Sequence, residues 1–292
     1  MMHRAMLAKP GGNVHFYCSS GGNAGLACAT AAATLGQPCT IVVPTLTAQH
    51  MIDKIRLLGA KVHQAGAHWA LADAHLRAEL LARDPDGVYV PPFDHADVWD
   101  GASSIVDELA AQLPAESQPD AVVCSVGGGG LLNGIMAGVQ RNYGGDGKKK
   151  PTVIAVETVG ADSLNASLRA GELVTLPGIT SVAISLGAPR VSERAFRWAR
   201  EEARHLKSVV VPDADAALGS VRFADDARML VEAACGATVA MAYNGELLRR
   251  TMGCEGVSDA EWRGKNVVLV VCGGLNVSLG LLGEYRERFG GT

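Results

Sequence analysis

The amino-acid sequence predicts an α/β protein made of two doubly wound, mostly parallel α/β units. The chain has 292 residues, of which 48% are hydrophobic and 35 are glycines, enough for one large or two modest domains with sizeable cores. Short apolar strands alternate with helical patterns, as expected for a parallel sheet covered on both faces. Glycines and small polar residues follow several of these strands, where open parallel sheets bind ligands.

The first hundred residues form a small α/β unit. The apolar stretch 14–19 predicts a buried strand, and the Ala-rich stretch 23–36 predicts a helix that Gly36 ends. The elements after these are a strand at 38–44, an amphipathic helix at 48–59, a strand at 60–66, a helix at 70–84 stopped before Pro85, and a strand at 87–93. We expect a boundary near Pro92, which divides a small domain, 1–92, from a large domain, 93–292.

The second unit repeats the alternation. Its predicted strands are 120–126, 151–160, 206–213 and 264–274. Its predicted helices are 98–113, a glycine-led helix that reaches 144, 163–173, 191–203, a long pattern at 226–248, and 279–290.

Composition excludes several classes of protein. The formal net charge of −4 disfavours a nucleic-acid surface, and the single lysine run, at 148–150, lies in a Gly-rich loop. The start lacks the long apolar core of a signal peptide, and no run of about 18 apolar residues predicts a membrane span. Seven cysteines without a CxxC motif predict buried free thiols in a reducing, cytoplasmic setting. The eight histidines show no zinc-ligand spacing.

The first ligand-binding candidate is SSGGNAG at 19–25, between a strand and a helix. Ser20 or Asn23 can cap the helix, and the glycines let a ligand approach the main chain. Amide groups at a helix start favour an anion such as a carboxylate. A plain tight turn explains the same residues equally well.

Two further corners follow predicted strands. The four glycines at 127–130 suit a cradle of amide groups for a phosphate. Leu132 and Asn133 occupy the positions where a GxGxxG motif would have its third glycine, which disfavours a dinucleotide and hence a nicotinamide-dependent oxidoreductase. At Cys272-Gly273-Gly274 a thiol could face a ligand, although a lone buried cysteine is more often core filler.

These corners, in this order, resemble the L-serine/threonine dehydratase family of fold-type-II pyridoxal-phosphate enzymes, whose fold is tryptophan synthase β-like. The resemblance covers nearly the whole chain. It rests on the motifs SSGGNAG, YVPPFD, VWDGASSIV, SVGGGGLLNG, AVETVGADSL, LPGITSVAISLG, VEAACGA and VVCGGLN.

The resemblance implies roles for individual residues. Those implied to bind the substrate carboxylate are Ser20, Gly21, Asn23 and Ala24. Those implied to bind pyridoxal 5'-phosphate are Asn23, Gly127, Gly128, Gly129, Gly130, Leu131, Ser185 and Cys272. Those implied to form a monovalent-cation site, suited to K+, are Gly127, Glu157, Ala161, Ser163, Leu186 and Ala188.

The resemblance also implies a reaction, the conversion of L-serine, or L-threonine, to pyruvate, or 2-oxobutanoate, and ammonia, by a homodimer. In the family a lysine binds the cofactor covalently and removes the α-proton. That lysine lies in a Ser-x-Lys-x-Arg-Gly stretch, whose place would precede residue 1 here, together with the first strands of the large domain. We therefore expect this chain to lack the catalytic lysine and to turn over little substrate, with Lys9 and Lys54 poor substitutes.

Three positions depart from the family pattern. Leu275 stands where a small hydroxyl residue is usual, and Asp100 and Ala102 stand where Gly-His is common. The first change should alter the cofactor environment, and the other two affect either activity or packing.

Two alternative functions stay open. One is a non-catalytic binding protein for pyridoxal phosphate or an amino acid, which the missing lysine supports. The other is a β-replacement enzyme such as a cysteine synthase, which Cys272 disfavours only moderately.

Overall fold

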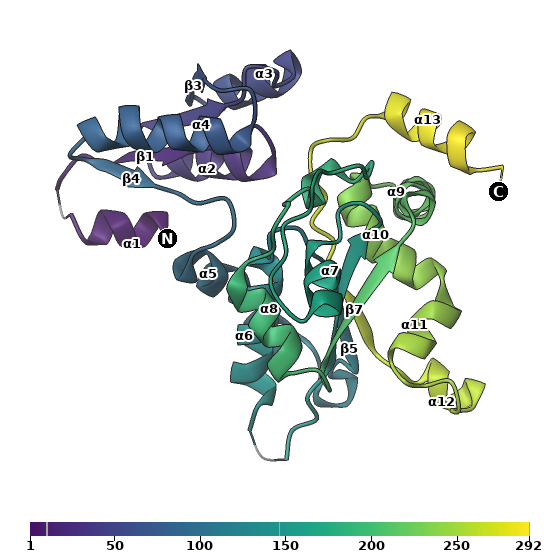
Figure 1. Cartoon of the computed structure of the whole chain (residues 1–292). Helices are drawn as coiled ribbons and strands as arrows, with labels where there is room; N and C mark the ends of the chain where they lie inside the picture. Colours follow the sequence, from purple (N-terminus) through teal and green to yellow (C-terminus); the bar gives the residue numbers. More distant parts are fainter. Residues whose placement is uncertain (10, 146, 292) are drawn as a thin grey trace. The chain divides into compact units, whose positions relative to one another are not determined.

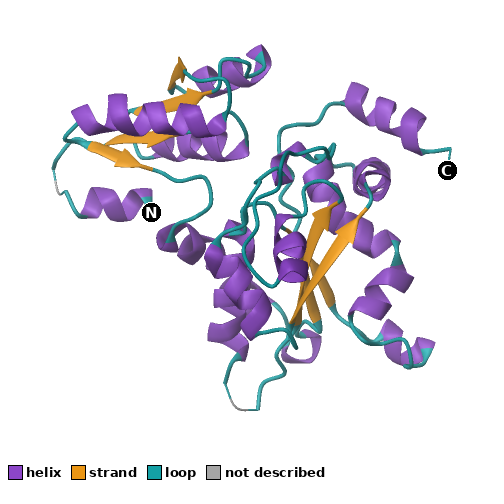
Figure 2. Cartoon of the chain, in the orientation of Figure 1, coloured by secondary structure: helices purple, strands orange, loops and turns teal. Residues whose placement is uncertain are grey.

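The chain divides into two compact units, Met1–Asp97 and Val98–Thr292. The computed structural model describes residues 1–9, 11–145 and 147–291 (Figure 1). Each unit contains a parallel sheet of four strands with helices against it (Figure 2), which confirms the predicted fold class. The predicted boundary near Pro92 falls a few residues before this division.

The sheet of the first unit has the strand order β3-β2-β1-β4. Its strands are β1 (His15–Cys18), β2 (Cys39–Val43), β3 (Lys61–Gln64) and β4 (Gly87–Tyr89). Its helices are α1 (Met2–Leu7), α2 (Asn23–Thr34), α3 (Gln49–Leu57) and α4 (Trp69–His75), the last continued by a π-helical turn (Leu76–Leu80) and a 3-10 turn (Leu81–Arg83). Every element predicted for this unit is present, although the helix predicted at 70–84 changes geometry after His75.

The side chains of β1 alternate between the two faces of this sheet, because successive residues of a strand point to opposite sides. Phe16 and Cys18 pack into the cluster that includes α2 and α3. Tyr17 packs on the other face, against Ala72 and Leu76. The strand is therefore covered on both sides, which explains why Phe16, Tyr17 and Cys18 are all buried.

The second unit has the strand order β7-β6-β5-β8. Its strands are β5 (Ala121–Ser125), β6 (Thr152–Thr158), β7 (Leu206–Val211) and β8 (Val267–Leu269). Its α-helices are α5 (Ala96–Gln112), which begins just before the division, α6 (Gly130–Tyr143), α7 (Ser163–Ala170), α8 (Glu193–Glu201), α9 (Asp213–Ala227), α10 (Ala233–Tyr243), α11 (Gly245–Thr251), α12 (Asp259–Arg263) and α13 (Leu279–Phe289). Two 3-10 turns, Ala115–Ser117 and Ile184–Leu186, complete it.

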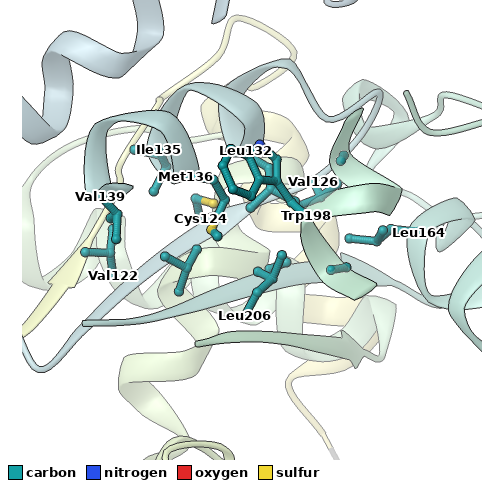
Figure 3. Packing of buried hydrophobic residues seen from close by; sticks show 14 of the residues in the cluster. Val122, Cys124, Val126, Leu132, Ile135, Met136, Val139, Leu164, Trp198 and Leu206 are labelled. Atoms are coloured by element: carbon teal, nitrogen blue, oxygen red, sulfur yellow. The ribbon is translucent and has the colours of Figure 1, made fainter. Parts of the chain in front are cut away.

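Two hydrophobic clusters cover the faces of this second sheet. Val122 and Cys124 of β5 point toward α6, where Ile135 and Val139 meet them (Figure 3). Val123, from the same strand, packs on the opposite face in the cluster formed with α9, α10 and α13. The central strands therefore bury both faces, and their carboxyl ends stay available for loops.

The helix predicted at 226–248 is wrong. Helix α9 ends at Ala227, and Arg228 adopts a left-handed conformation with φ of 59° before α10 begins at Ala233. The apolar pattern of the segment does not reveal this reversal, because it records which residues are buried and not the backbone turn between them. The sequence prediction also missed the body of α9 and all of α12.

The prediction of buried thiols holds for five cysteines, but it is wrong for Cys272. Cys254 is partly buried and Cys272 is exposed. Strand β8 ends at Leu269, so Cys272 lies beyond the sheet and not within a strand. No helix in the described ranges is long and apolar enough to cross a membrane.

Candidate functional site

The first glycine-rich corner joins the end of β1 to the start of α2. Helix α2 begins at Asn23 with Gly22 as its N-cap, and a glycine has no side chain with which to cap it. The N-cap position is thus held by Gly22, and not by Ser20 or Asn23 as expected. The Ser20 hydroxyl instead accepts the N–H of Gly22 at 3.2 Å. The main-chain amides at this positive end of the helix favour an anion.

Two glycines of this corner are required by close packing. A Cβ on Gly25 would lie 1.9 Å from the carbonyl oxygen of Ser20, so α2 could not approach the loop. A Cβ on Gly21 would lie 2.9 Å from a methyl group of Thr47. The loop is thus closely packed at Gly21 and Gly25, and these two positions carry main chain without a side chain.

The second corner, the four glycines at 127–130, joins β5 to α6. Gly129 has φ of 90°, and a Cβ there would lie 2.7 Å from the Cβ of Ala195. A Cβ on Gly127 would lie 3.2 Å from the Cα of Leu186. The N–H of Ser192 donates to the carbonyl of Gly128 at 3.0 Å, and the N-cap of α6 is Gly129, which has no side chain to cap it. The close packing disfavours a merely flexible turn, and the uncapped helix start suits a phosphate.

The third corner follows β8 and is held by Glu232, a residue that the sequence analysis did not single out. Glu232 is 5% exposed, and its carboxylate accepts the N–H of Asn276 at 3.0 Å. Its own N–H donates to the carbonyl of Gly273 at 2.9 Å. The signal in the sequence was the motif VEAACGA, which includes Glu232, but nothing in it indicates the long-range contact.

This third corner also brings together two residues implied to contact the cofactor. The side-chain amide of Asn276 donates to the hydroxyl of Ser185 at 3.1 Å, which joins the turn Ile184–Leu186 to the loop after Cys272. Packing around the thiol, with the neighbouring Cys235 and Glu232, raises the pKa of Cys272 to about 11. The thiol is therefore neutral near pH 7. Leu275, a departure from the family pattern, is 47% exposed beside it.

Residues of the implied cation site lie around the end of β6. Glu157 is fully buried, and its two carboxylate oxygens accept the N–H groups of Leu164 and Asn165 at 2.8 Å each. Burial outweighs these two hydrogen bonds and raises the pKa of Glu157 to about 8. The hydroxyl of Ser163 is buried and finds no hydrogen-bond partner among the described residues. Leu186 is buried against Gly127, and Ala161 is also buried.

Ala102, another departure, has a structural role. A Cβ on Gly134 of α6 would lie 2.5 Å from the Cβ of Ala102 and 2.8 Å from the carbonyl oxygen of Trp99. Helices α5 and α6 therefore cross closely at this point, with the partly buried Ala102 at the contact.

The predicted site residues therefore lie in both units. Ser20, Gly21, Asn23 and Ala24 belong to the first unit, and the residues of the glycine cradle, Ser185, Cys272 and the cation set belong to the second. Within the second unit, the structure joins Ser185 to the Cys272 corner and places Gly127 against Leu186.

Known proteins share both the sequence and this architecture. Residues 1–273 match the model of the family described as pyridoxal-phosphate dependent enzyme. The chain is 42% identical over 276 residues to an L-serine dehydratase of Saccharomyces cerevisiae (strain AWRI1631), which covers 92% of this chain and 79% of that protein. It is 45% identical over 276 residues to a Homo sapiens protein named serine dehydratase-like, which covers 94% of this chain and 80% of that protein.

Comparison of the fold with solved structures also finds a serine ammonia-lyase. The structure matches that of a fungal L-serine ammonia-lyase from Rhizomucor miehei with a TM-score of 0.83 at 38% identity, over 98% of this chain and 85% of that one. The chain therefore belongs to the pyridoxal-phosphate dependent enzyme family, within its group of serine dehydratases.

Proposed function

We propose that the chain is an L-serine ammonia-lyase that eliminates the β-hydroxyl of L-serine to give pyruvate and ammonia, with L-threonine as a second candidate substrate. The observation that carries this proposal is the match to serine dehydratases, at 42% and 45% identity over most of the chain, and to the fold of an L-serine ammonia-lyase. The thiol of Cys272, in the corner that Glu232 and Asn276 organise, agrees with it. A neutral thiol next to a pyridine nitrogen leaves that nitrogen unprotonated, which suits elimination of a β-hydroxyl better than deeper carbanion chemistry.

The residues of the chain fit pyridoxal phosphate. When bound, this cofactor supplies a conjugated ring that withdraws electrons from the α-carbon of an amino acid. The glycines at 127–130, with Leu131, would hold its phosphate, and close packing against Leu186 and Ala195 requires glycine at positions 127 and 129 of this loop. Cys272 would lie at the ring nitrogen and Ser185 near one ring face.

The substrate would be held by the first unit. Ser20, Gly21, Asn23 and Ala24 would bind the carboxylate of the amino acid through main-chain amides at the start of α2, and Asn23 would also contact the 3-hydroxyl of the cofactor. The glycine N-cap, which exposes main chain at the start of α2, supports this assignment.

A monovalent cation, K+ in our proposal, would be bound by oxygen atoms of Gly127, Glu157, Ala161, Ser163, Leu186 and Ala188. The buried hydroxyl of Ser163 supports the site, because a buried polar group without a partner is costly unless a ligand satisfies it.

We further propose a cytoplasmic homodimer. The seven cysteines are free thiols, which agrees with a reducing compartment.

We also propose that none of the lysines of this chain binds the cofactor covalently. Lys9 Nζ donates to the carbonyl of Pro85 at 3.0 Å and lies 3.6 Å from a carboxylate oxygen of Asp86, which supports a surface role. Incubation with pyridoxal phosphate, borohydride reduction and peptide mass mapping should give no stoichiometric adduct on any lysine. One stoichiometric adduct would refute this part of the proposal.

The reaction itself is tested with a chimera that carries a Ser-x-Lys-x-Arg-Gly segment of the family at its N-terminus. We expect pyruvate from L-serine, measured with coupled lactate dehydrogenase. A product that forms only when sulfide is added would instead indicate a β-replacement enzyme. A chimera that binds cofactor and amino acid without any turnover would indicate a non-catalytic binding protein.

A further inference from the structure

Asp73 of α4 collects hydrogen bonds from three directions. Its Oδ1 accepts from the hydroxyl of Ser19 at 2.5 Å and from the phenol of Tyr89 at 2.6 Å. Its Oδ2 accepts from Nε of Arg77, one helical turn further along, at 2.8 Å. One carboxylate thus joins the end of β1, the end of β4 and the helix region that covers them.

Ser19 is held at a second atom as well. The indole N–H of Trp69 donates to the carbonyl oxygen of Ser19 at 2.6 Å. Residues of α4 therefore bind both the hydroxyl and the main-chain carbonyl of Ser19, and Ser19 is fully buried. The next residue along the chain is Ser20, the first of the loop that we assign to the substrate carboxylate.

The position of Ser19 follows from strand geometry. Side chains two residues apart on a strand share a face, and Tyr17 already packs toward α4. Ser19 continues that face just beyond the end of β1, and Tyr89 of the neighbouring strand lies on it too. The sheet therefore directs the Ser19 and Tyr89 hydroxyls to the same carboxylate.

The negative charge of Asp73 is balanced by the positive charge of Arg77. Arg77 pairs with Asp73 and its guanidinium lies 3.9 Å from the centre of the Tyr89 ring. Burial of Asp73 opposes ionisation, but hydrogen bonds from Ser19, Tyr89 and Arg77 outweigh it and hold the pKa of this carboxyl below its usual value. Asp73 is thus a charged acceptor near pH 7, and hydrogen bonds to a charged group are stronger than neutral ones.

We propose that Asp73 is the positioning residue of the carboxylate-binding loop. By fixing Ser19 at its hydroxyl, with Trp69 fixing its carbonyl, it holds the following amides in the orientation that an α-amino acid carboxylate requires. A preformed loop binds more tightly because the ordering cost is met before the ligand arrives. This inference rests on the function proposed above.

The chain offers a matched control for the test. Tyr17 is the register partner of Tyr89 in the sheet, and its phenol donates to Asp84 at 2.8 Å. Asp84 precedes β4, whereas Ser19 follows β1. Tyr17→Phe therefore removes the same kind of tyrosine–aspartate hydrogen bond from the same face without touching Ser19.

The experiment compares two ligands by isothermal titration calorimetry with the full chain. N-(5′-phosphopyridoxyl)-L-serine carries ring, phosphate and amino-acid carboxylate, whereas pyridoxamine 5′-phosphate lacks the carboxylate. We expect Asp73→Asn to lower the affinity for the serine conjugate about 10-fold and Tyr89→Phe to lower it about 3-fold. These values follow from the free energy that hydrogen bonds to a charged group contribute. Neither variant should change the affinity for pyridoxamine phosphate, and Tyr17→Phe should bind both ligands as the wild type does.

The outcomes separate this inference from the proposed function. If the wild type binds both ligands and the Asp73 and Tyr89 variants bind the conjugate equally well, only the positioning role is refuted. The same conclusion follows if the variants lose both ligands equally. A wild type that binds neither ligand overturns the proposed function and this inference together. Tyr89→Phe keeps the test decisive if Asp73→Asn does not fold, as judged by circular dichroism.

Discussion

Gly274 lies directly against the carboxyl group of Glu232. A Cβ on Gly274 would come within 2.1 Å of Cδ of Glu232, and the same carboxylate accepts the N–H of Asn276 at 3.0 Å. A buried acidic side chain thus shapes the loop that carries Cys272, and the glycine is required because it lets the main chain approach the carboxylate.

Gly274→Ala should destabilise the chain more than Gly273→Ala. Both residues have a left-handed backbone, with φ of 84° and 80°, so each substitution carries a cost of about 1–2 kcal/mol. A methyl group on Gly273 meets nothing within 4 Å, whereas one on Gly274 displaces Glu232 from Asn276. We expect a further loss of about 2 kcal/mol in the free energy of unfolding for Gly274→Ala, measured by urea denaturation. Equal losses for the two variants would contradict the role of Glu232.

Cys272 should react slowly with alkylating reagents although it is exposed. A pKa of about 11, against a usual value of 9.0, lowers the thiolate fraction at pH 8 about 100-fold, and the thiolate is the reactive form. We expect iodoacetamide to modify Cys272 roughly 30- to 100-fold more slowly than a cysteine in a short unstructured peptide, as followed by peptide mass mapping. The rate should rise with pH up to about 11. A rate equal to that of the peptide would show that the thiol is not held neutral.

The stability of the first unit should fall in mild acid because of His15. Burial, with Lys61 nearby, lowers the pKa of His15 below 6.5, and Asp84 only partly opposes this. The unfolded chain therefore binds the proton first as the pH drops through about 6.5, and unfolding becomes more favourable until the folded-state pKa is passed. Urea denaturation at pH 7 and pH 5 should show a smaller loss in His15→Gln than in the wild type. Identical losses in both proteins would rule out this contribution.

A K+ site at Ser163 predicts an ion-specific gain in stability. We expect KCl to raise the Tm of the wild type more than tetramethylammonium chloride does at equal concentration, because only K+ is bound by the oxygen ligands. Ser163→Ala should lose that difference. Without K+ the same variant should be neutral or up to about 1 kcal/mol more stable, since it removes a buried hydroxyl without a partner.

Ser167→Ala is the matched control for the cation test. Ser167 is also a buried serine of α7, but its hydroxyl donates to the carbonyl of Ser163 at 2.7 Å and accepts the N–H of Val174 at 3.1 Å. This variant should be destabilised by about 1–2 kcal/mol and should keep the K+-specific rise in Tm. A K+-specific rise that survives in Ser163→Ala would argue against the site.

Local sequence predicted most of the fold and the glycine-rich corners at the ends of strands. Central strands such as β5 and β6 show as continuous apolar runs, because a parallel strand is buried on both faces. The glycine-rich stretches that follow β1 and β5 are equally local, so the position of these two strand-to-helix corners could be predicted without the fold. Local pattern failed at Arg228, where a single left-handed residue divides two helices.

The sequence by itself therefore determined the α/β class, the order of the elements and the corners at the ends of strands, since these depend on residues close together along the chain. Only the tertiary structure decided what holds each corner in shape. Asp73 meets Ser19 across 54 positions of sequence, and Glu232 meets Asn276 across 44. Such contacts depend on how strands align and how helices pack over them. The sequence around Asp73 or Glu232 does not indicate which distant residue each will contact.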